Sequence, residues 1–132
     1  MNQTTAARVA AFIDGEGCLT RRKWTRKDDT LVVIPVLQVI NTAWRLIEWF
    51  HKMFEGYVSV IDQRKNWKPA YRWELRGVAA VNLIKACYGW FIVKAQHVRW
   101  FVKYKLPQKK PRDYLYNWRI SERVQKLNKR GR

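Results

Sequence analysis

Hydrophobic residues recur along this chain with two different periods, and the changes of period predict the order of its elements. Apolar residues return every three or four positions over residues 4–14, 42–54, 77–88, 93–104 and 113–127, which predicts five helices. Residues 31–40, 57–61 and 71–75 are rich in β-branched and aromatic residues, and residues 17–27 alternate poorly but can form a strand, so we predict four strands. We therefore expect an α+β fold with an α-β-β-α-β-β-α core, a four-stranded antiparallel sheet and further helix towards the end.

Turn and cap residues punctuate this pattern. Gly15 is expected just past the first helix, and Asn41 or Thr42 is expected to cap the second. Residues 28–29 resemble a hairpin turn between the first two strands. Pro35 predicts an edge position or a bulge in the second strand, because proline cannot donate to a sheet.

The charge balance changes the picture from a plain globular domain to one with a charged partner. The chain has 132 residues, 48% of them apolar, and a net charge of +17. That length supports one domain, which we place at residues 1–106. Residues 107–132 are expected to form a basic linker and a helix that packs on or extends it. Such a positive excess indicates a polyanionic partner such as nucleic acid.

Several classes of protein fit the composition poorly. There are two cysteines without a CxxC pair and only two histidines, which disfavours a disulfide framework or a zinc site. No apolar run approaches the ~20 residues of a membrane span, and the first residues lack a secretory signature. An intracellular protein without a membrane segment is expected.

Residues 9–17, VAAFIDGEG, join the end of the first helix to the first strand. Small side chains let two helices approach closely. Two acids, Asp14 and Glu16, follow at the end of this stretch. We interpret the stretch as a helix that meets a second copy of itself, with acids that hold metal over DNA.

This nonapeptide resembles the signature of the LAGLIDADG homing endonucleases position by position. Residues 38–42, 71–73 and 93–96 are similar to other parts of that family, and residues 127–131 resemble the ending of members with one motif. The resemblance implies a homodimer that binds double-stranded DNA and cuts both strands of a long, roughly palindromic site. It implies short 3′ overhangs and Mg²⁺, with Mn²⁺ as a substitute and Ca²⁺ supporting binding without cleavage. An intron or an intein is the expected genetic setting.

The resemblance also assigns roles to residues of this chain. It makes Glu16 and the Gly15 carbonyl metal ligands, with Asp14 supporting the helix end first and binding metal second. It places Asn41, Arg45, Lys94 and Gln96 in the catalytic site. The dimer contact is expected at Val9, Ala10, Ala11 and Phe12. Ala11 stands where glycine is common in the family, and Glu16 is longer than aspartate. Without the resemblance, Arg45 and Lys94 would be ordinary solvated charges.

The alternation of the strands predicts which side chains face DNA. If Leu19 faces the core, a period of two turns the other face of the sheet to the major groove. The predicted DNA-binding residues are Thr20, Arg22, Trp24, Arg26, Gln38, Ser59, Ile61, Gln63, Arg72 and Glu74. Gln38 suits adenine, whereas Arg22 and Arg72 suit guanine. The alternative is a solvated sheet surface, and a bulge at Pro35 would reverse the faces of the second strand.

Two questions stay open at this level. The basic tail could contact phosphates, or its helix could only pack on the core through Trp118 and Leu127. The same basic sheet would also serve an RNA maturase that binds intron RNA, or a DNA-binding regulator that no longer cleaves.

Overall fold

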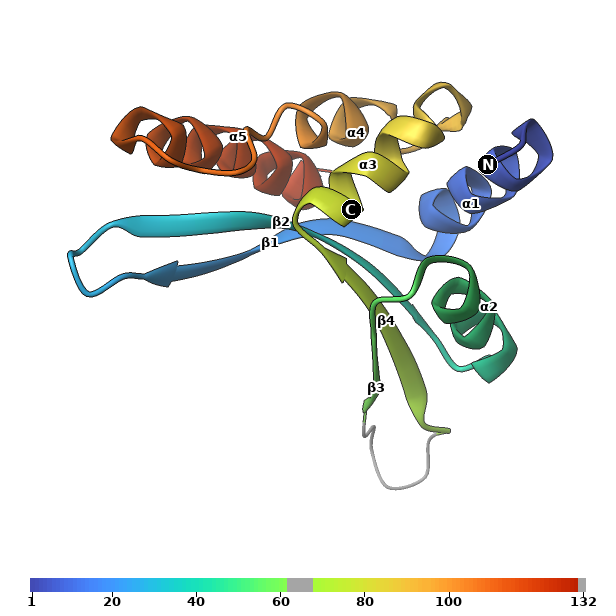
Figure 1. Cartoon of the computed structure of the whole chain (residues 1–132). Helices are drawn as coiled ribbons and strands as arrows, with labels where there is room; N and C mark the ends of the chain where they lie inside the picture. The colour runs from blue at the N-terminus through green and yellow to red at the C-terminus, as the bar shows by residue number, and fades with distance from the viewer. Residues whose placement is uncertain (62–67, 131–132) are drawn as a thin grey trace.

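The computed structural model describes residues 1–61 and 68–130, so the predicted DNA contact Gln63 lies outside the described residues. In chain order the elements are α1 Gln3–Glu16, β1 Gly17–Thr25, β2 Leu31–Asn41, α2 Trp44–Phe54, β3 Tyr57–Ile61, β4 Ala70–Arg76, α3 Val78–Ala86, the short 3₁₀ helix η1 Tyr88–Trp90, α4 Ala95–Phe101 and α5 Pro111–Arg130 (Figure 1). This order confirms the predicted α+β core and its additional helix at the end.

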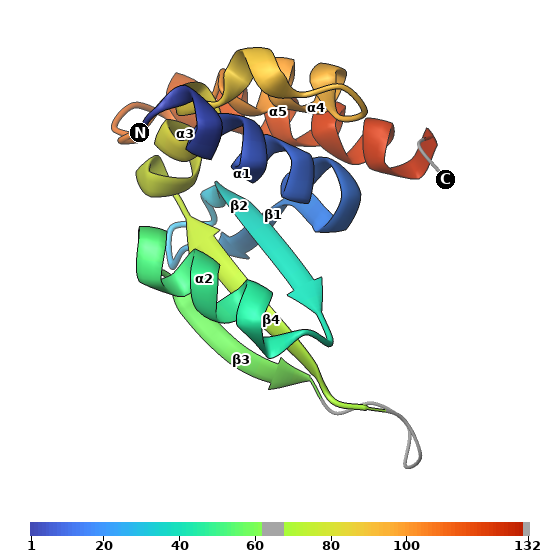
Figure 2. The same cartoon turned by 90° about the vertical axis from the view of Figure 1, so that its right-hand side faces the viewer.

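The four strands form one antiparallel sheet in the order β1-β2-β4-β3. Its register is unbroken, so Leu19 lies opposite Leu37, and Leu37 lies opposite Leu75. Directly opposed residues share a face, and these three leucines point into the core. The helices gather on that face and leave the other face of the sheet open (Figures 1 and 2). The predicted facing of β1, β2 and β4 is thereby confirmed.

Pro35 lies inside β2 without a bulge, although β2 is an interior strand of the sheet. Its carbonyl accepts a hydrogen bond from Gly77 N, just where β4 has ended. In an antiparallel strand the N–H and C=O of one residue point the same way. Pro35, which has no N–H, therefore turns its nitrogen to the β4 side of β2, at the level where β4 has ended. Proline is tolerated there, because no strand on that side requires a hydrogen bond from it.

The core joins the helices to the inner face of the sheet. From α1 it takes Ala6, Val9, Ala10 and Ile13, all buried. Phe50 of α2 stacks on Trp73 of β4 with ring centroids 4.8 Å apart, and both side chains have no exposed surface. The indole N–H of Trp73 donates to the Glu55 carbonyl at the end of α2. These contacts fix α1 and α2 against the sheet beside one another.

Some boundaries differ from the predicted ones. Helix α1 continues to Glu16, so Gly15 is helical and does not follow the helix. The N-cap of α2 is Ala43; Asn41 lies two residues earlier, at the end of β2, and its side-chain oxygen accepts from Ala43 N at 2.7 Å. Helix α4 is only seven residues long. At its start, residues 92–94 form a loop held by a contact with α1 that sequence periodicity does not report, and at its end Val102 is already the C-cap.

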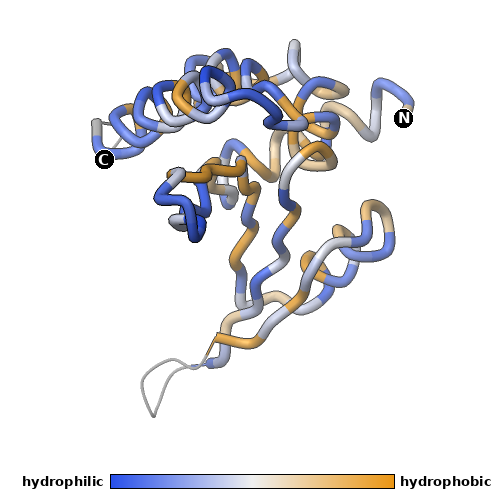
Figure 3. The backbone as a smooth tube through the Cα atoms, turned by 60° about the vertical axis from the view of Figure 1, so that its left-hand side comes forward, coloured by the Kyte–Doolittle hydropathy of each residue, from blue (hydrophilic) through white to orange (hydrophobic). Residues whose placement is uncertain are grey.

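Helix α5 covers the inner face and outer edge of the β1–β2 hairpin. Ile120 and Val124 enter the core, and the Asn128 amide donates to the Leu19 carbonyl of the edge strand β1. Trp118 lies beneath the Arg21 guanidinium, 4.6 Å from it. Much of α5 is hydrophilic (Figure 3). The helix therefore does pack on the core, whereas its contact with phosphates and the division at residue 107 stay predictions. Within the described residues, no helix has the length and apolar character to cross a membrane.

Candidate functional site

An open hollow of about 500 Å³ lies beside the end of α1. Its lining residues come from α1, the end of β2 and the start of α2: Arg8, Phe12, Glu16, Asn41, Ala43, Arg45, Leu46 and Trp49. Three of the predicted catalytic residues, Glu16, Asn41 and Arg45, therefore meet in one place. They meet because α1 runs directly into β1, and β2 brings Asn41 back beside it.

Glu16 and Gly15 form the exposed end of α1. A Cβ added to Gly15 would meet no atom of this chain within 4 Å. The last carbonyls of a helix have no partner within the helix, so this end offers a carboxylate and carbonyl oxygens to anything that approaches it. Within residues 1–61 and 68–130, no group of three His, Cys, Asp or Glu side chains gathers to hold a metal ion.

Asp14 faces the other way and holds a loop. Its carboxylate accepts from Ile92 N at 2.8 Å and from Lys94 N at 2.9 Å. The Lys94 ammonium returns a hydrogen bond to the Asp14 carbonyl at 2.9 Å. Both carboxylate oxygens of Asp14 are therefore used to join α1 to the start of α4. This arrangement agrees with the supporting role expected first for Asp14. It also places the Lys94 ammonium against Asp14, which is two residues before Glu16 in α1.

Two of the predicted catalytic residues, Arg45 and Gln96, lie in the first turns of α2 and α4. Arg45 is exposed in the first turn of α2 and lines the hollow together with Glu16. Gln96 is exposed in the first turn of α4, two residues beyond Lys94. The hollow therefore combines one acid with two arginines, Arg8 and Arg45.

The four residues expected at the dimer contact divide between two sides of α1. Val9 and Ala10 have no exposed surface, because they pack in the core of their own chain. Ala11 is exposed and Phe12 is partly buried against Trp49. Only Ala11 and Phe12 of the four are placed where a second copy could touch them.

The open face of the sheet displays most of the predicted DNA-binding residues. Trp24 of β1 and Ser59 of β3 are exposed on it, and Ile61 is partly exposed. Thr20 is partly buried, because its hydroxyl accepts from the Gln125 amide of α5 at 3.0 Å. Of the other predicted members that the structure describes, Arg22, Gln38, Arg72 and Glu74 lie in the middle of the face, and Arg26 lies at its rim.

Two arginines at the rim and the middle differ in their surroundings. Arg26 lies beyond the end of β1, where its guanidinium donates to the Tyr114 hydroxyl at 3.0 Å. Arg72 lies between Ile40 and Ser59 in the register. Its Nε is buried and has no hydrogen-bond partner among the described residues. Arg72 Nε is therefore a buried donor without a partner among the described residues, whereas part of the hydrogen-bonding capacity of Arg26 is already used.

Glu74 lies on the open face but is only 2% exposed. Its carboxylate accepts from Gln38 Nε2 at 2.7 Å, from Arg22 Nη2 at 3.1 and 3.2 Å, and from Arg76 Nε. Burial of the carboxylate raises its pKa, but the hydrogen bonds from Gln38, Arg76 and Arg22 lower the pKa by more than burial raises it. The pKa of Glu74 is therefore below its usual value. Glu74 is ionised and enclosed by two arginines.

Sequence reasoning missed Arg8 and Arg76 as site residues. Arg8, Phe12 and Glu16 are spaced four apart, which places them on one face of a helix. Arg76 continues the alternation of Arg72 and Glu74 along β4. Both periods were present in the sequence and could have identified these residues.

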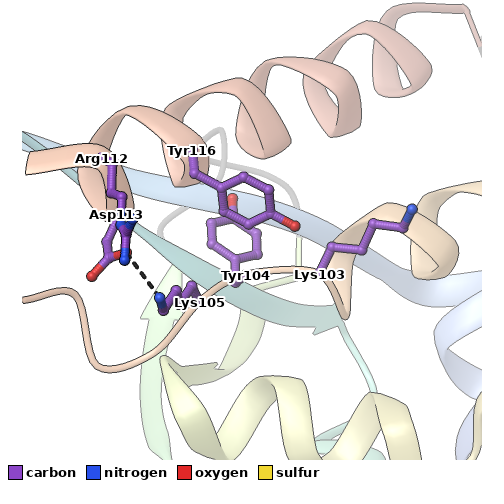
Figure 4. A pocket seen from close by; sticks show the side chains of 6 residues that line it. All are labelled: Lys103, Tyr104, Lys105, Arg112, Asp113 and Tyr116. Carbon is purple, nitrogen blue, oxygen red and sulfur yellow. Dashed lines mark ion pairs between the residues drawn. The ribbon is translucent and has the colours of Figure 1, made fainter. Parts of the chain in front are cut away.

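A second hollow of about 540 Å³ lies between the end of α4 and the start of α5, away from α1 (Figure 4). Lys103, Tyr104, Lys105, Arg112, Asp113 and Tyr116 line it. The Asp113 carboxylate accepts from the backbone N–H of Lys109 and Lys110 and pairs with the Lys105 ammonium at 3.2 Å. The acid of this hollow is thus engaged in holding the turn into α5.

Comparison with known proteins identifies the fold. No family model matches this sequence, and no curated protein matches it either. Among solved structures, the chain is similar to the homing endonuclease I-CvuI in complex with DNA in the presence of Mg, with a TM-score of 0.76 and 18% identity over 95% of this chain and 82% of that chain. It is similar to I-Vdi141I, an archaeal intron-encoded homing endonuclease complexed with DNA, with a TM-score of 0.73 and 12% identity over 93% and 83% of the two chains.

A third similarity covers only part of a longer protein. The meganuclease I-SmaMI, bound to uncleavable DNA, matches with a TM-score of 0.69 and 15% identity over 89% of this chain but only 43% of that chain. At these identities the similarity establishes architecture. The chain has the fold of the LAGLIDADG homing endonucleases.

Proposed function

We propose that this chain is a site-specific DNA endonuclease that acts as a homodimer and depends on a divalent metal ion. One observation carries the proposal: the fold places the exposed carboxylate of Glu16 and the free end of α1 beside an open, arginine-bearing sheet face. The net charge of +17 supports DNA as the partner.

The donor set at the end of α1 suits Mg²⁺. Mg²⁺ binds carboxylate and carbonyl oxygens and keeps several waters. Glu16 and the Gly15 carbonyl would supply such ligands from each copy, and phosphate oxygens of DNA would complete the set. When bound, the ion would supply charge stabilisation and a water of lowered pKa. The chain's own residues orient that site: Asp14 fixes the end of the helix, and the Asn41 amide faces the same hollow as Glu16.

Lysine and arginine side chains would act on the charge that develops at the phosphate. Lys94 is held beside the end of α1 by its hydrogen bond to the Asp14 carbonyl. Arg45 and Arg8 line the hollow and can bind phosphate oxygens there. Gln96 would support Lys94 from the next turn. We assign Glu16 and Lys94 the roles closest to the reacting phosphate.

A second copy would complete the site. The outer side of α1 carries the exposed Thr4, Ala11 and Gly15 and the partly exposed Ala7, so two such helices could approach closely. This chain covers only 43% of the I-SmaMI chain, which is consistent with a functional unit built from two such folds. A homodimer would read a roughly palindromic site.

Metal-dependent cleavage of DNA tests the proposal directly. The full chain is incubated with a randomised duplex library and Mg²⁺, and new double-stranded ends are captured by ligation and sequenced. We expect a single family of cut sequences with Mg²⁺, and binding without cutting with Ca²⁺. Glu16→Gln should abolish cutting while DNA binding remains.

Glu55→Gln is the matched control, because it removes the same charge at the far end of α2, about 16 Å along that helix from Trp44 at its start. This control should cut like the unaltered chain. The absence of any cut sequence with Mg²⁺ would overturn the nuclease assignment. Continued cutting by Glu16→Gln would overturn the role of Glu16 as metal ligand.

A further inference from the structure

Glu74, Arg22, Gln38 and Arg76 form a charge network in the middle of the open sheet face. The burial and the hydrogen bonds of Glu74 in this network are not those of a residue that contacts DNA directly. Glu74 faces Gln38 across β2 and β4, and Arg22 reaches it from β1. Val36 lies between Thr20 and Arg76 in the register and has no exposed surface, so the network closes over the sheet at this point. Glu74 is buried beneath the side chains that it binds, whereas Arg22 is 46% exposed.

Both carboxylate oxygens of Glu74 are already fully hydrogen-bonded, so neither can accept a hydrogen bond from a DNA base. Its Oε1 accepts from Gln38 and Arg22, and its Oε2 accepts from Arg22 and Arg76. A glutamate that reads cytosine must accept from the cytosine N4 amine in the groove. Glu74 is too deeply buried and too fully bonded to do so.

The donors that remain are those that purines require. Arg22 binds Glu74 through Nε and Nη2, so Nη1 keeps its donors. The planar fork can then pair with guanine O6 and N7 from its Nη1 side. Arg76 binds Glu74 through Nε and lies 4.7 Å over the Tyr57 ring, so its plane is fixed in the same manner.

Gln38 is oriented by the same carboxylate. One amide hydrogen of Nε2 is given to Glu74 at 2.7 Å, and the other hydrogen and Oε1 remain. A bidentate pair with adenine needs one donor and one acceptor, so this orientation preserves that capacity. The three side chains arise from three adjacent strands, which lie about 4.8 Å apart.

We propose that Glu74 is a positioning residue that orients Arg22, Gln38 and Arg76 as one unit for reading purines in the major groove. Glu74 itself does not touch DNA. The unit spans about 10 Å across β1, β2 and β4, which corresponds to about three consecutive base pairs. This inference rests on the proposed function in so far as it takes DNA as the partner.

Selection of DNA sites without cleavage tests this role. The full chain, Glu74→Gln and Glu122→Gln are each equilibrated with a randomised duplex library in EDTA, and the bound sequences are read. Glu122 pairs with Arg21 at 2.8 Å on the opposite face of β1, so its variant breaks an Arg–Glu pair away from the open face. We expect Glu74→Gln to lose about tenfold or more of the base preference at one run of about three positions in each half-site. Glu122→Gln should keep the profile.

A second readout separates positioning from general damage. Glu74→Gln removes a negative charge from the sheet, so its non-specific affinity for DNA at low salt should hold or increase. Val98→Ala, which opens the core at α4, should lower all preferences together. If Glu74→Gln does not fold, Glu74→Asp keeps the charge on a shorter arm and should weaken the same positions.

Three results would overturn the inference. They are an unchanged profile in Glu74→Gln, a uniform loss like that of Val98→Ala, and a parent chain that binds duplex DNA without base preference. Mg²⁺-dependent cleavage is measured separately. A chain that cuts defined sites while Glu74→Gln retains its profile therefore refutes the positioning role and leaves the nuclease assignment intact.

Discussion

Replacing Gly15 with alanine tests where a second copy would meet this chain. In the isolated chain the added Cβ meets nothing within 4 Å. Alanine in a helix is favoured over glycine by about 1 kcal/mol. Gly15 lies in the last turn of α1, so the gain is at most about that amount. For a domain of this length it corresponds to a rise in melting temperature of roughly 3–5 °C.

The same methyl group has the opposite effect if α1 pairs with a second α1 through this side. Each dimer then carries two added methyl groups in a close helix contact, and overpacking typically costs about 1–3 kcal/mol per site. The dimer dissociation constant should rise at least about 30-fold. We therefore expect Gly15→Ala to stabilise the monomer, weaken the dimer and slow cleavage.

Thermal unfolding over a range of protein concentrations measures the first effect, and sedimentation equilibrium with and without DNA measures the second. Gly17→Ala provides the contrast two residues away, because a Cβ there would lie 2.8 Å from the Ile13 carbonyl and Cα. It should destabilise the fold itself. A Gly15→Ala chain that associates and cuts like its parent would refute a contact through this side of α1.

Two further predictions concern the supports of the site. Asp14→Ala removes the acceptor for Ile92 N and Lys94 N. It should lower the free energy of unfolding, measured with urea, by about 1–3 kcal/mol and speed hydrogen exchange at these two amides. Glu16→Ala should leave the two amides protected, and unchanged exchange in Asp14→Ala would contradict the role of Asp14 in holding this loop. The backbone N–H groups of Lys110 and Lys109 and the Lys105 ammonium hold the pKa of Asp113 at about 2, below its usual 3.8. A lowered folded-state pKa gives stability that is present above about pH 4 and is lost as pH falls from about 4 towards 2. Asp113→Asn should flatten this part of the pH–stability curve, and a curve of unchanged steepness would show that Asp113 does not contribute to it.

Much of the fold followed from local patterns. The order of elements and the facing of β4 were predictable, because the alternation of Trp73, Glu74 and Leu75 reports which side that strand buries. The facing of β1 followed from placing Leu19 in the core, since β1 itself alternates poorly. The helix ends were less predictable. Gly15 carries a common stop signal, yet α1 continues to Glu16, since the Gly17 N–H can still reach the Ile13 carbonyl.

The sequence predicted which residues belong to the candidate site better than it predicted how they lie relative to one another. Glu16, Asn41 and Arg45 do share one hollow. The assignment of Val9 and Ala10 to a dimer contact did not allow for the core of their own chain, which covers that side of α1 completely. A single helix with small residues on more than one side does not reveal which side its own domain will cover.

By itself, the sequence determined the α+β order, the strand faces, the positive charge and the acid at the end of α1, because each depends on residues close together in the chain. Tertiary structure alone decided that Asp14 binds the backbone of residues 92–94, that Glu74 gathers side chains from β1, β2 and β4, and that the outer side of α1 is the one carrying Ala11 and Gly15. These features depend on which elements pack together across 36 to 80 positions of sequence. Local periodicity carries no information about such contacts until the sheet has formed.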